Sequence, residues 1–121
     1  MKGLEGIKVV ELTGYVAAPA CPRILGEMGA TIYKIEPFSG DEYRTNGPEG
    51  AAFVEKLLAD ADVMITSFRD NALKKLSLDY EAVHARHPHL VWAQMRGYGE
   101  YGPERDSKGF DTTAYGARGG F

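Results

Sequence analysis

The architecture of this chain can be worked out from one segment near its start, Ile7-Lys8-Val9-Val10-Glu11-Leu12-Thr13-Gly14. Its first six residues are mostly apolar and include three β-branched side chains, a composition that favours an extended strand. Thr13 and Gly14 are typical of a turn, so we expect the strand to end there and to open into a loop.

The residues after this loop predict a helix and then further strands. Pro19 suits the first turn of a helix, and Ile24, Leu25 and Met28 recur at helical spacing up to Gly29, a residue that commonly ends helices. The same order then repeats along the chain. We predict strands over 31–35, 62–66 and 89–95, and helices over 49–59, 71–76 and from the N-cap Asp79 to about 86.

Strands that alternate with helices predict an α/β fold with a Rossmann-like, mostly parallel sheet, flanking helices and right-handed crossovers. The segment 97–109 carries four glycines and a proline and is expected to be a loop. Asp111 is expected to cap a last short helix that ends near 117. The sequence shows no repeat and no linker, so residues 1–121 are interpreted as one domain.

Composition excludes several classes of function. The chain has 121 residues, with 14 basic and 17 acidic side chains and a net charge of −3, so a basic surface for nucleic acid is not expected. No apolar run is long enough for a membrane span, and the start does not resemble a signal peptide. The single cysteine, Cys21, excludes an internal disulfide framework and suits a reducing compartment. We therefore expect a soluble, cytoplasmic protein.

In a parallel sheet, ligands bind beyond the carboxyl ends of the strands, here the loops that start at Thr13, Pro37, Ser67 and Gly97. The first loop leads into a helix N-terminus that can receive an anion such as a phosphate. It holds only one of the three glycines of a dinucleotide fingerprint, Gly14, although Glu36 lies where a ribose-binding acid would be. A nicotinamide cofactor is thus an alternative, and a strand-end acid beside solvent or a cation is the simpler interpretation of Glu36.

A second candidate site is Arg96-Gly97-Tyr98-Gly99, at the end of the fourth predicted strand. It combines a cation, two flexible backbone positions and an aromatic ring, which could hold a phosphate and a flat or thioester-bearing ligand. The alternative is a glycine turn beside a surface arginine. Lys74 and Lys75 could likewise contribute to an anion site or form a solvated helix face.

Other reactive side chains have simpler structural explanations. Cys21 lies one turn into a helix and could be a thiolate nucleophile, but no base partner is identifiable and a small buried apolar residue is favoured. His84, His87 and His89 could suggest a metal, yet Pro88 interrupts their spacing, so a solvated helix end is favoured and no metal is expected. Asp111 could be a nucleophile, although the N-cap position explains it better.

Taken together, several segments resemble family III CoA-transferases, the group of formyl-CoA and carnitinyl-CoA transferases. They are the stretches 4–12, 17–21, 29–37 with 39–41, 57–63, 72–73, 78–80, 87–88, 97–99 and 102–103, which follow the order of the family. The segment 108–120 resembles the branch that acts on 2-hydroxyacyl-CoA and aryl-lactate substrates.

The resemblance implies an activity and a set of contacts. Family members move CoA from an acyl-CoA to a carboxylic acid through an aspartyl anhydride and an aspartyl-CoA thioester, in two interlinked chains, so a homodimer or other self-association is implied. The residues that match the family's CoA contacts, called here the predicted contact residues, are Gly14, Tyr15, Val16, Ser67, Phe68, Lys75, Arg96, Gly97 and Tyr98. Ser67 stands where asparagine is frequent, and Pro37 where a basic residue often contacts CoA.

Two further departures from the family pattern bear on activity. The catalytic aspartate of the family is expected beyond Phe121, and Asp111 is not its counterpart. Between Asn46 and Pro48 the family carries an additional strand and loop, so the sheet is expected to be incomplete relative to the family. Two alternatives to a CoA-transferase therefore stay open. They are a non-catalytic CoA-binding fragment or interaction module, and an unrelated Rossmann-like nucleotide binder.

Overall fold

The computed structural model describes residues 3–14, 17–36, 48–107 and 109 of the chain. Its elements, in chain order, are β1 (Lys8–Leu12), α1 (Ala17–Glu27), β2 (Thr31–Lys34), α2 (Pro48–Ala59), β3 (Val63–Thr66), α3 (Asp70–Lys75), α4 (Tyr80–Arg86) and β4 (Val91–Gln94). The strands form one sheet in the order β2-β1-β3-β4, and every neighbouring pair is parallel. The predicted α/β class and parallel sheet are confirmed.

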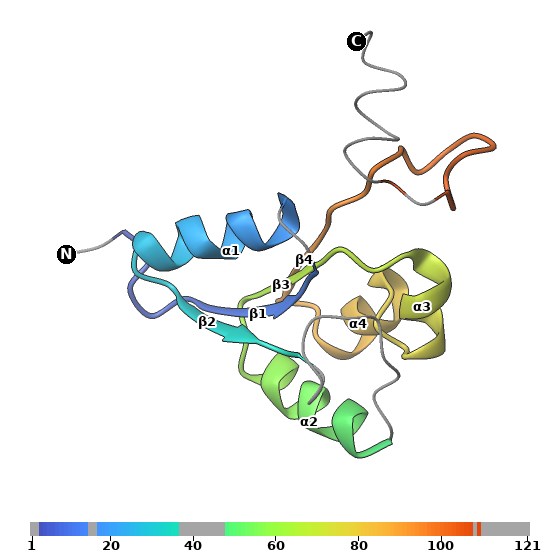
Figure 1. Cartoon of the computed structure of the whole chain (residues 1–121). Helices are drawn as coiled ribbons and strands as arrows, with labels where there is room; N and C mark the ends of the chain where they lie inside the picture. Colours follow the sequence, from blue (N-terminus) through green and yellow to red (C-terminus); the bar gives the residue numbers. More distant parts are fainter. Residues whose placement is uncertain (1–2, 15–16, 37–47, 108, 110–121) are drawn as a thin grey trace, which may run out of the picture.

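The central strand β1 is buried on both faces, as expected for a parallel sheet covered by helices. Figure 1 shows α1 on one face of the sheet and α2 and α4 on the other. Val9 and Val10 point to opposite faces, and both side chains are fully buried. The pairing of β1 with β2 aligns Val10 with Tyr33, and its pairing with β3 aligns Val10 with Met64.

The main hydrophobic core lies between the sheet and the helices α2, α3 and α4. The strands contribute alternate side chains, which are joined by residues from all three helices and from the adjoining turns. Its buried members are Val10, Leu12, Val54, Leu58, Ala61, Met64, Leu73, Leu78, Val83 and Leu90. Burial of these apolar side chains is the main source of stability for the fold.

Local signals in the sequence account for several element ends. Gly29 adopts a φ of 109° just after α1, in the left-handed region that glycine tolerates, so the predicted helix end is confirmed. The Asp79 side chain accepts a hydrogen bond from the Ala82 N–H at 3.4 Å, which confirms the predicted cap of α4. The helix predicted after Asp111 lies outside the described residues.

The last predicted strand is shorter than expected. The apolar pattern predicted a strand over 89–95, whereas β4 covers only Val91–Gln94. Leu90 donates its N–H to the carbonyl of His87 at 3.1 Å, so this part of the segment closes a turn instead of pairing with β3.

In the described part of the chain, no helix combines the length and apolar character that a membrane span requires.

Candidate functional site

The strand order creates one preferred place for a ligand. From β1 the chain passes through α1 to β2 on one side, and from β2 it crosses through α2 to β3 on the other side of β1. The loops that follow β1 and β3 therefore leave neighbouring strands in opposite directions. Such a topological switch point, at the carboxyl ends of the strands, is where open α/β sheets bind ligands.

Gly14 and Ser67 join the two loops at this switch point. The Gly14 N–H donates to the Ser67 Oγ at 3.1 Å, and the Ser67 N–H donates to the carbonyl of Leu12 at 3.2 Å. A serine hydroxyl has one proton and two acceptor lone pairs, so accepting from Gly14 leaves the hydroxyl proton to be donated to a ligand. Both residues belong to the predicted contact residues, and the structure brings them together.

A buried polar pair lies at the end of β1, beneath the first loop. Thr13 donates its hydroxyl to the Glu11 Oε1, and the two residues are only 3% and 4% exposed. A carboxylate withdrawn from water is stabilised only when it is hydrogen-bonded, so this pair constrains the exit of β1. This pair was not predictable from the sequence, because Glu11 occupies an otherwise apolar strand and gives no local sign of its partner.

Phe68 is anchored through its backbone. Its N–H donates to the Thr66 Oγ1 at 3.1 Å, and its carbonyl accepts from the Gln94 Nε2 at 2.7 Å. The aromatic ring is partly buried against the main core. Gln94, at the end of β4, also donates to the Asp70 Oδ1 at 3.1 Å. The loop after β3 is thus fastened to the neighbouring strand.

Arg96 has a protein partner, where the sequence suggested a cation free to bind phosphate. Its Nη2 lies 2.6 Å from the Asp70 Oδ2, and the arginine side chain is only 14% exposed. Apart from this ion pair, the buried Nη2 has no hydrogen-bond partner among the described residues. The contact is therefore chiefly one of opposite charges, and donor capacity remains on the guanidinium.

The Asp70 carboxyl is held in its ionised form. Partial burial raises its pKa, but the hydrogen bond from Gln94, the ion pair with Arg96 and the charge of Arg105 together outweigh this effect and lower it. The net result is a pKa below the ordinary value of 3.8, so Asp70 is negative at neutral pH.

The remaining predicted contact residues have different surroundings. Gly97 and Tyr98 follow Arg96, the first exposed and the second partly buried. Lys75 is exposed at the end of α3, the helix that starts directly after the loop of Ser67 and Phe68. Tyr15 and Val16 lie outside the described residues.

Glu36, considered above as a ribose-binding acid, pairs with Lys34, at 2.6 Å between Nζ and Oε1. This ion pair confirms the simpler interpretation of Glu36 as a strand-end acid beside a cation.

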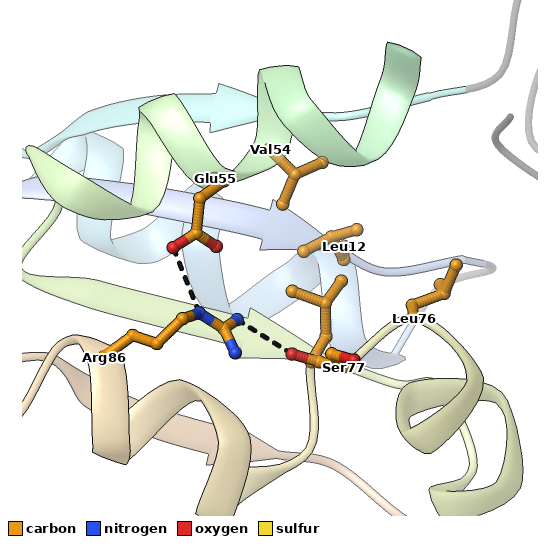
Figure 2. Close-up of a pocket in the computed structure, with 7 residues that line it drawn as sticks. Leu12, Val54, Glu55, Leu76, Ser77 and Arg86 are labelled. Carbon is orange, nitrogen blue, oxygen red and sulfur yellow. Dashed lines mark hydrogen bonds and ion pairs between the residues drawn. The ribbon is translucent and has the colours of Figure 1, made fainter. Parts of the chain in front are cut away.

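A pocket of about 230 Å³ lies beside the end of β1, on the face covered by α2 and α4 (Figure 2). Its lining is Leu12, Val54, Glu55, Leu76, Ser77, Leu78 and Arg86. The Arg86 guanidinium crosses it, with Nε donating to Glu55 at 3.0 Å and Nη2 to the Ser77 carbonyl at 2.8 Å. Its Nη1 donates to the Ala82 carbonyl at 2.9 Å. Each guanidinium nitrogen of Arg86 thus donates one hydrogen bond to the protein, and the rest of the lining is largely apolar.

His87 corrects one sequence-based expectation. A solvated helix end was predicted for the histidine group, but His87 is 9% exposed and its Nε2 lies 2.8 Å from the Glu55 Oε1. A carboxylate only accepts hydrogen bonds, so Nε2 carries the proton in this contact.

His84 and His89 are exposed, as predicted. Cys21, predicted to be a buried apolar residue, is only partly buried. Among the described ranges, no group of three or more histidine, cysteine or acidic residues could hold a metal.

Glu55 predicts a loss of stability in acid. Partial burial raises its pKa, but bonds from Arg86 and His87 and their charges outweigh this and hold the pKa below 4.5. Because the folded-state pKa is lowered, Glu55 contributes stability above its unfolded pKa, and the contribution disappears as pH falls through the folded pKa. We expect Glu55→Gln to lower the free energy of unfolding at neutral pH, with a difference from wild type that shrinks between about pH 5 and pH 3.

Urea denaturation at a series of pH values would measure this effect. Lys56→Gln, at an exposed position of the same helix, is the matched control for a change of one charge. A difference between Glu55→Gln and wild type that stays constant down to pH 3, about one unit below the usual range for glutamate, would contradict the assignment.

Comparison with known proteins places this fold and these loops in a family. A protein-family model described as CoA-transferase family III matches residues 4–52 and 46–121, which together cover almost the whole chain. The chain belongs to CoA-transferase family III. The resemblance found in the sequence is therefore confirmed.

Two curated members of the family are similar over nearly the whole chain. The (R)-2-hydroxy-4-methylpentanoate CoA-transferase of Clostridioides difficile is 38% identical, over 97% of this chain and 37% of its own length. The cinnamoyl-CoA:phenyllactate CoA-transferase of Clostridium sporogenes is 37% identical, over 96% of this chain and 36% of its own length. The chain thus spans little more than a third of the curated relatives it matches.

Alignment and structure agree with the family assignment. The alignment with the C. difficile family member covers 148 positions, 27 more than the 121 residues of this chain. The two segments matched by the family model meet at 46–52, where the sequence analysis expects the family to carry additional residues. The crystal structure of a CAIB/BAIF family protein from Brucella suis superimposes with a TM-score of 0.87, at 32% identity over 98% of this chain and 39% of that chain.

Proposed function

We propose that this chain forms the CoA-binding part of a transferase that moves CoA from an acyl-CoA to a carboxylic acid. The observation that carries the proposal is the Gly14–Ser67 hydrogen bond, because it places two predicted contact residues together at the switch point of the sheet. CoA carries phosphates and a flexible thiol-bearing arm, so it needs both anion-binding groups and a long groove along the strand ends.

The described side chains supply parts of such a site. The Ser67 hydroxyl can donate its proton to an oxygen of the ligand, and the first loop leads into α1. The N-terminal end of a helix favours an anion. Arg96 supplies a positive charge beside the same loops. Tyr15, Val16, Lys75, Gly97 and Tyr98 complete the proposed set of contacts. The proposal requires no metal.

The proposed chemistry uses a carboxylate nucleophile that forms an aspartyl-CoA intermediate. A covalent step of this kind divides one difficult acyl transfer into easier ones. We assign the nucleophile to an aspartate outside residues 1–121 and give Asp111 no role in it. The acceptor is proposed to be a 2-hydroxy acid, since two relatives at 37–38% identity are named for 2-hydroxy-4-methylpentanoate and phenyllactate.

The alternative is a CoA- or nucleotide-binding fragment without turnover. A homodimer or other self-association belongs to either version of the proposal. The exposed side chains of Val91, on β4, and of Met95, directly after it, supply apolar surface that such an assembly would cover.

Calorimetric titration of the 121-residue chain with CoA tests the proposal. We expect saturable binding of CoA, weakened by Ser67→Ala, because the alanine variant loses the hydroxyl donor and the bond to Gly14. Ser107→Ala, in the loop after β4, is the matched serine control and is expected to bind CoA like wild type. NAD⁺ serves as the competing ligand.

The outcomes of this titration separate the candidate functions. Binding of CoA without transfer from an acyl-CoA to a 2-hydroxy acid supports a CoA-binding part that needs a nucleophile from elsewhere. Binding of NAD⁺ but not of CoA would reject the proposal in favour of an unrelated nucleotide binder. Turnover that disappears in Asp111→Ala would reject the assignment of the nucleophile to another residue.

A further inference from the structure

Asp70 and Gln94 connect the two loops that carry the proposed CoA contacts, although neither residue belongs to the predicted set. We infer that Asp70 and Gln94 are positioning residues, which hold Arg96 and the backbone of Phe68 in the arrangement that receives CoA. The inference rests on the proposed function. It adds to that function two residues that act through others and need not touch the ligand themselves.

Gln94 is the fixed point of this connection. In the β3–β4 register it lies opposite Thr66, and the next residue, Met95, donates its N–H to the Thr66 carbonyl at 2.8 Å. From this anchored position one side-chain nitrogen reaches both the Phe68 carbonyl at 2.7 Å and the Asp70 Oδ1 at 3.1 Å. Gln94 therefore sets the distance between the end of β4 and the loop after β3.

Asp70 extends the connection to Arg96. Its Oδ1 accepts from Gln94 and its Oδ2 lies 2.6 Å from the Arg96 Nη2, so one carboxylate holds two partners from the end of β4. An arginine side chain has several rotatable bonds, and ordering it before the ligand arrives removes part of the entropy loss on binding. Asp70 thus prepares Arg96 for an anionic group of CoA.

The charges around Asp70 are compatible with an anionic ligand. Arg96 and Arg105 both act electrostatically on the Asp70 carboxylate, and Arg105 also pairs with Asp106 at 3.2 Å. Asp70 is thus not the only carboxylate here, and its negative charge is compensated before an anion arrives. Beyond the ion pair with Asp70, the Arg96 guanidinium has further N–H donors, which a phosphate oxygen could use.

If Asp70 had a purely structural role, its variants would behave differently in CoA binding from those of a positioning residue. Asp70 is the first residue of α3, so its loss could simply weaken that helix. In that case its variants would change the free energy of unfolding without changing the affinity for CoA once the protein is folded. A positioning role predicts a change in CoA affinity that depends on the presence of Arg96.

CoA titrations of four proteins test the inference: wild type, Asp70→Asn, Arg96→Gln and the double variant. We expect Asp70→Asn to weaken CoA binding about fivefold, and the double variant to bind no more weakly than Arg96→Gln alone, because Asp70 acts through Arg96. Asp70→Glu keeps the charge and should retain more affinity than Asp70→Asn. Asp79→Asn, at the cap of α4, is the matched control and should bind like wild type.

Each outcome of these titrations either supports or overturns the positioning role of Asp70 and Gln94. Wild-type affinity in Asp70→Asn, or additive losses in the double variant, would overturn the positioning role while leaving the proposed function in place. If wild type itself binds no CoA, the proposed function and the inference both fail. If Asp70→Asn does not fold, Gln94→Met, which keeps the size but removes the donor, tests the same connection. Wild-type affinity in that variant would overturn the inference.

Discussion

Replacing Gly97 with alanine will lower the free energy of unfolding by about 1–3 kcal/mol. A Cβ built on Gly97 would overlap the Cα of Gly109 and lie 3.2 Å from its carbonyl carbon, so it would meet backbone and not a flexible side chain. The two segments can relieve this overlap only by moving apart. Because Gly97 follows Arg96 directly, we also expect the affinity for CoA to fall roughly tenfold or more.

Gly99→Ala is the matched control, since a Cβ at Gly99 would meet no atom within 4 Å. Gly109→Ala should reproduce the effect of Gly97→Ala, because its Cβ would overlap the Cα of Gly97 in turn. Urea denaturation gives the free energies of unfolding, and calorimetry gives the CoA affinities. Equal stability and affinity in Gly97→Ala and Gly99→Ala would show that the contact between 97 and 109 does not constrain the protein.

Truncation of Leu58 to alanine will cause the largest loss of stability among the changes considered, about 2–5 kcal/mol. Leu58 lies in α2, its side chain is fully buried, and it belongs to the main core beneath β1 and β3. The alanine leaves a cavity that the surrounding side chains fill only in part. Domains of this size are typically stable by only about 5–15 kcal/mol, so the variant should unfold at markedly lower urea concentration.

Phe53→Ala is the control for this change. It removes a larger apolar side chain from the same helix, but Phe53 is 59% exposed. Its effect on the free energy of unfolding should therefore be within about 0.5 kcal/mol of zero. Similar losses in the two variants would mean that α2 does not pack on the sheet through the face that carries Leu58.

The fold was largely predictable because its elements are marked by local signals. The β-branched residues of β1, the glycine after α1 and the Asp79 cap each act within a few residues, and the structure confirms all three. Such patterns do not specify which strands become neighbours. The pairing of β1 with β3 joins residues more than fifty positions apart, and only the folded chain reveals it.

The candidate site was predictable only in part, for the same reason. Ser67 and Gly14 were identified, and they meet in the structure. Asp70 was missed because its role depends on Gln94, which is 24 residues away, and on Arg96. A glutamine inside the apolar stretch of β4 was the one available signal for this connection.

The prediction for His87 failed on another long-range contact. Its position beside Pro88, at the end of a helix, predicted solvent exposure. Glu55, 32 residues earlier in the chain, instead accepts a hydrogen bond from the imidazole and covers it. Polarity along the sequence gives no information about a partner that arrives from a different helix.

The strand order also makes the two walls of the candidate site unequal in rigidity. Gly14 follows β1 and Ser67 follows β3, and each of these strands is hydrogen-bonded on both sides. Arg96 and Gly97 follow β4, which has one neighbouring strand in the part of the chain that the structure describes and carries the 60% exposed Val91. Amide protons in singly paired strands generally exchange with solvent sooner than those in the sheet interior. We therefore expect amide exchange to be slower at the ends of β1 and β3 than at the end of β4, where the side-chain links of Gln94 to Phe68 and of Asp70 to Arg96 hold the chain in place of a second neighbouring strand.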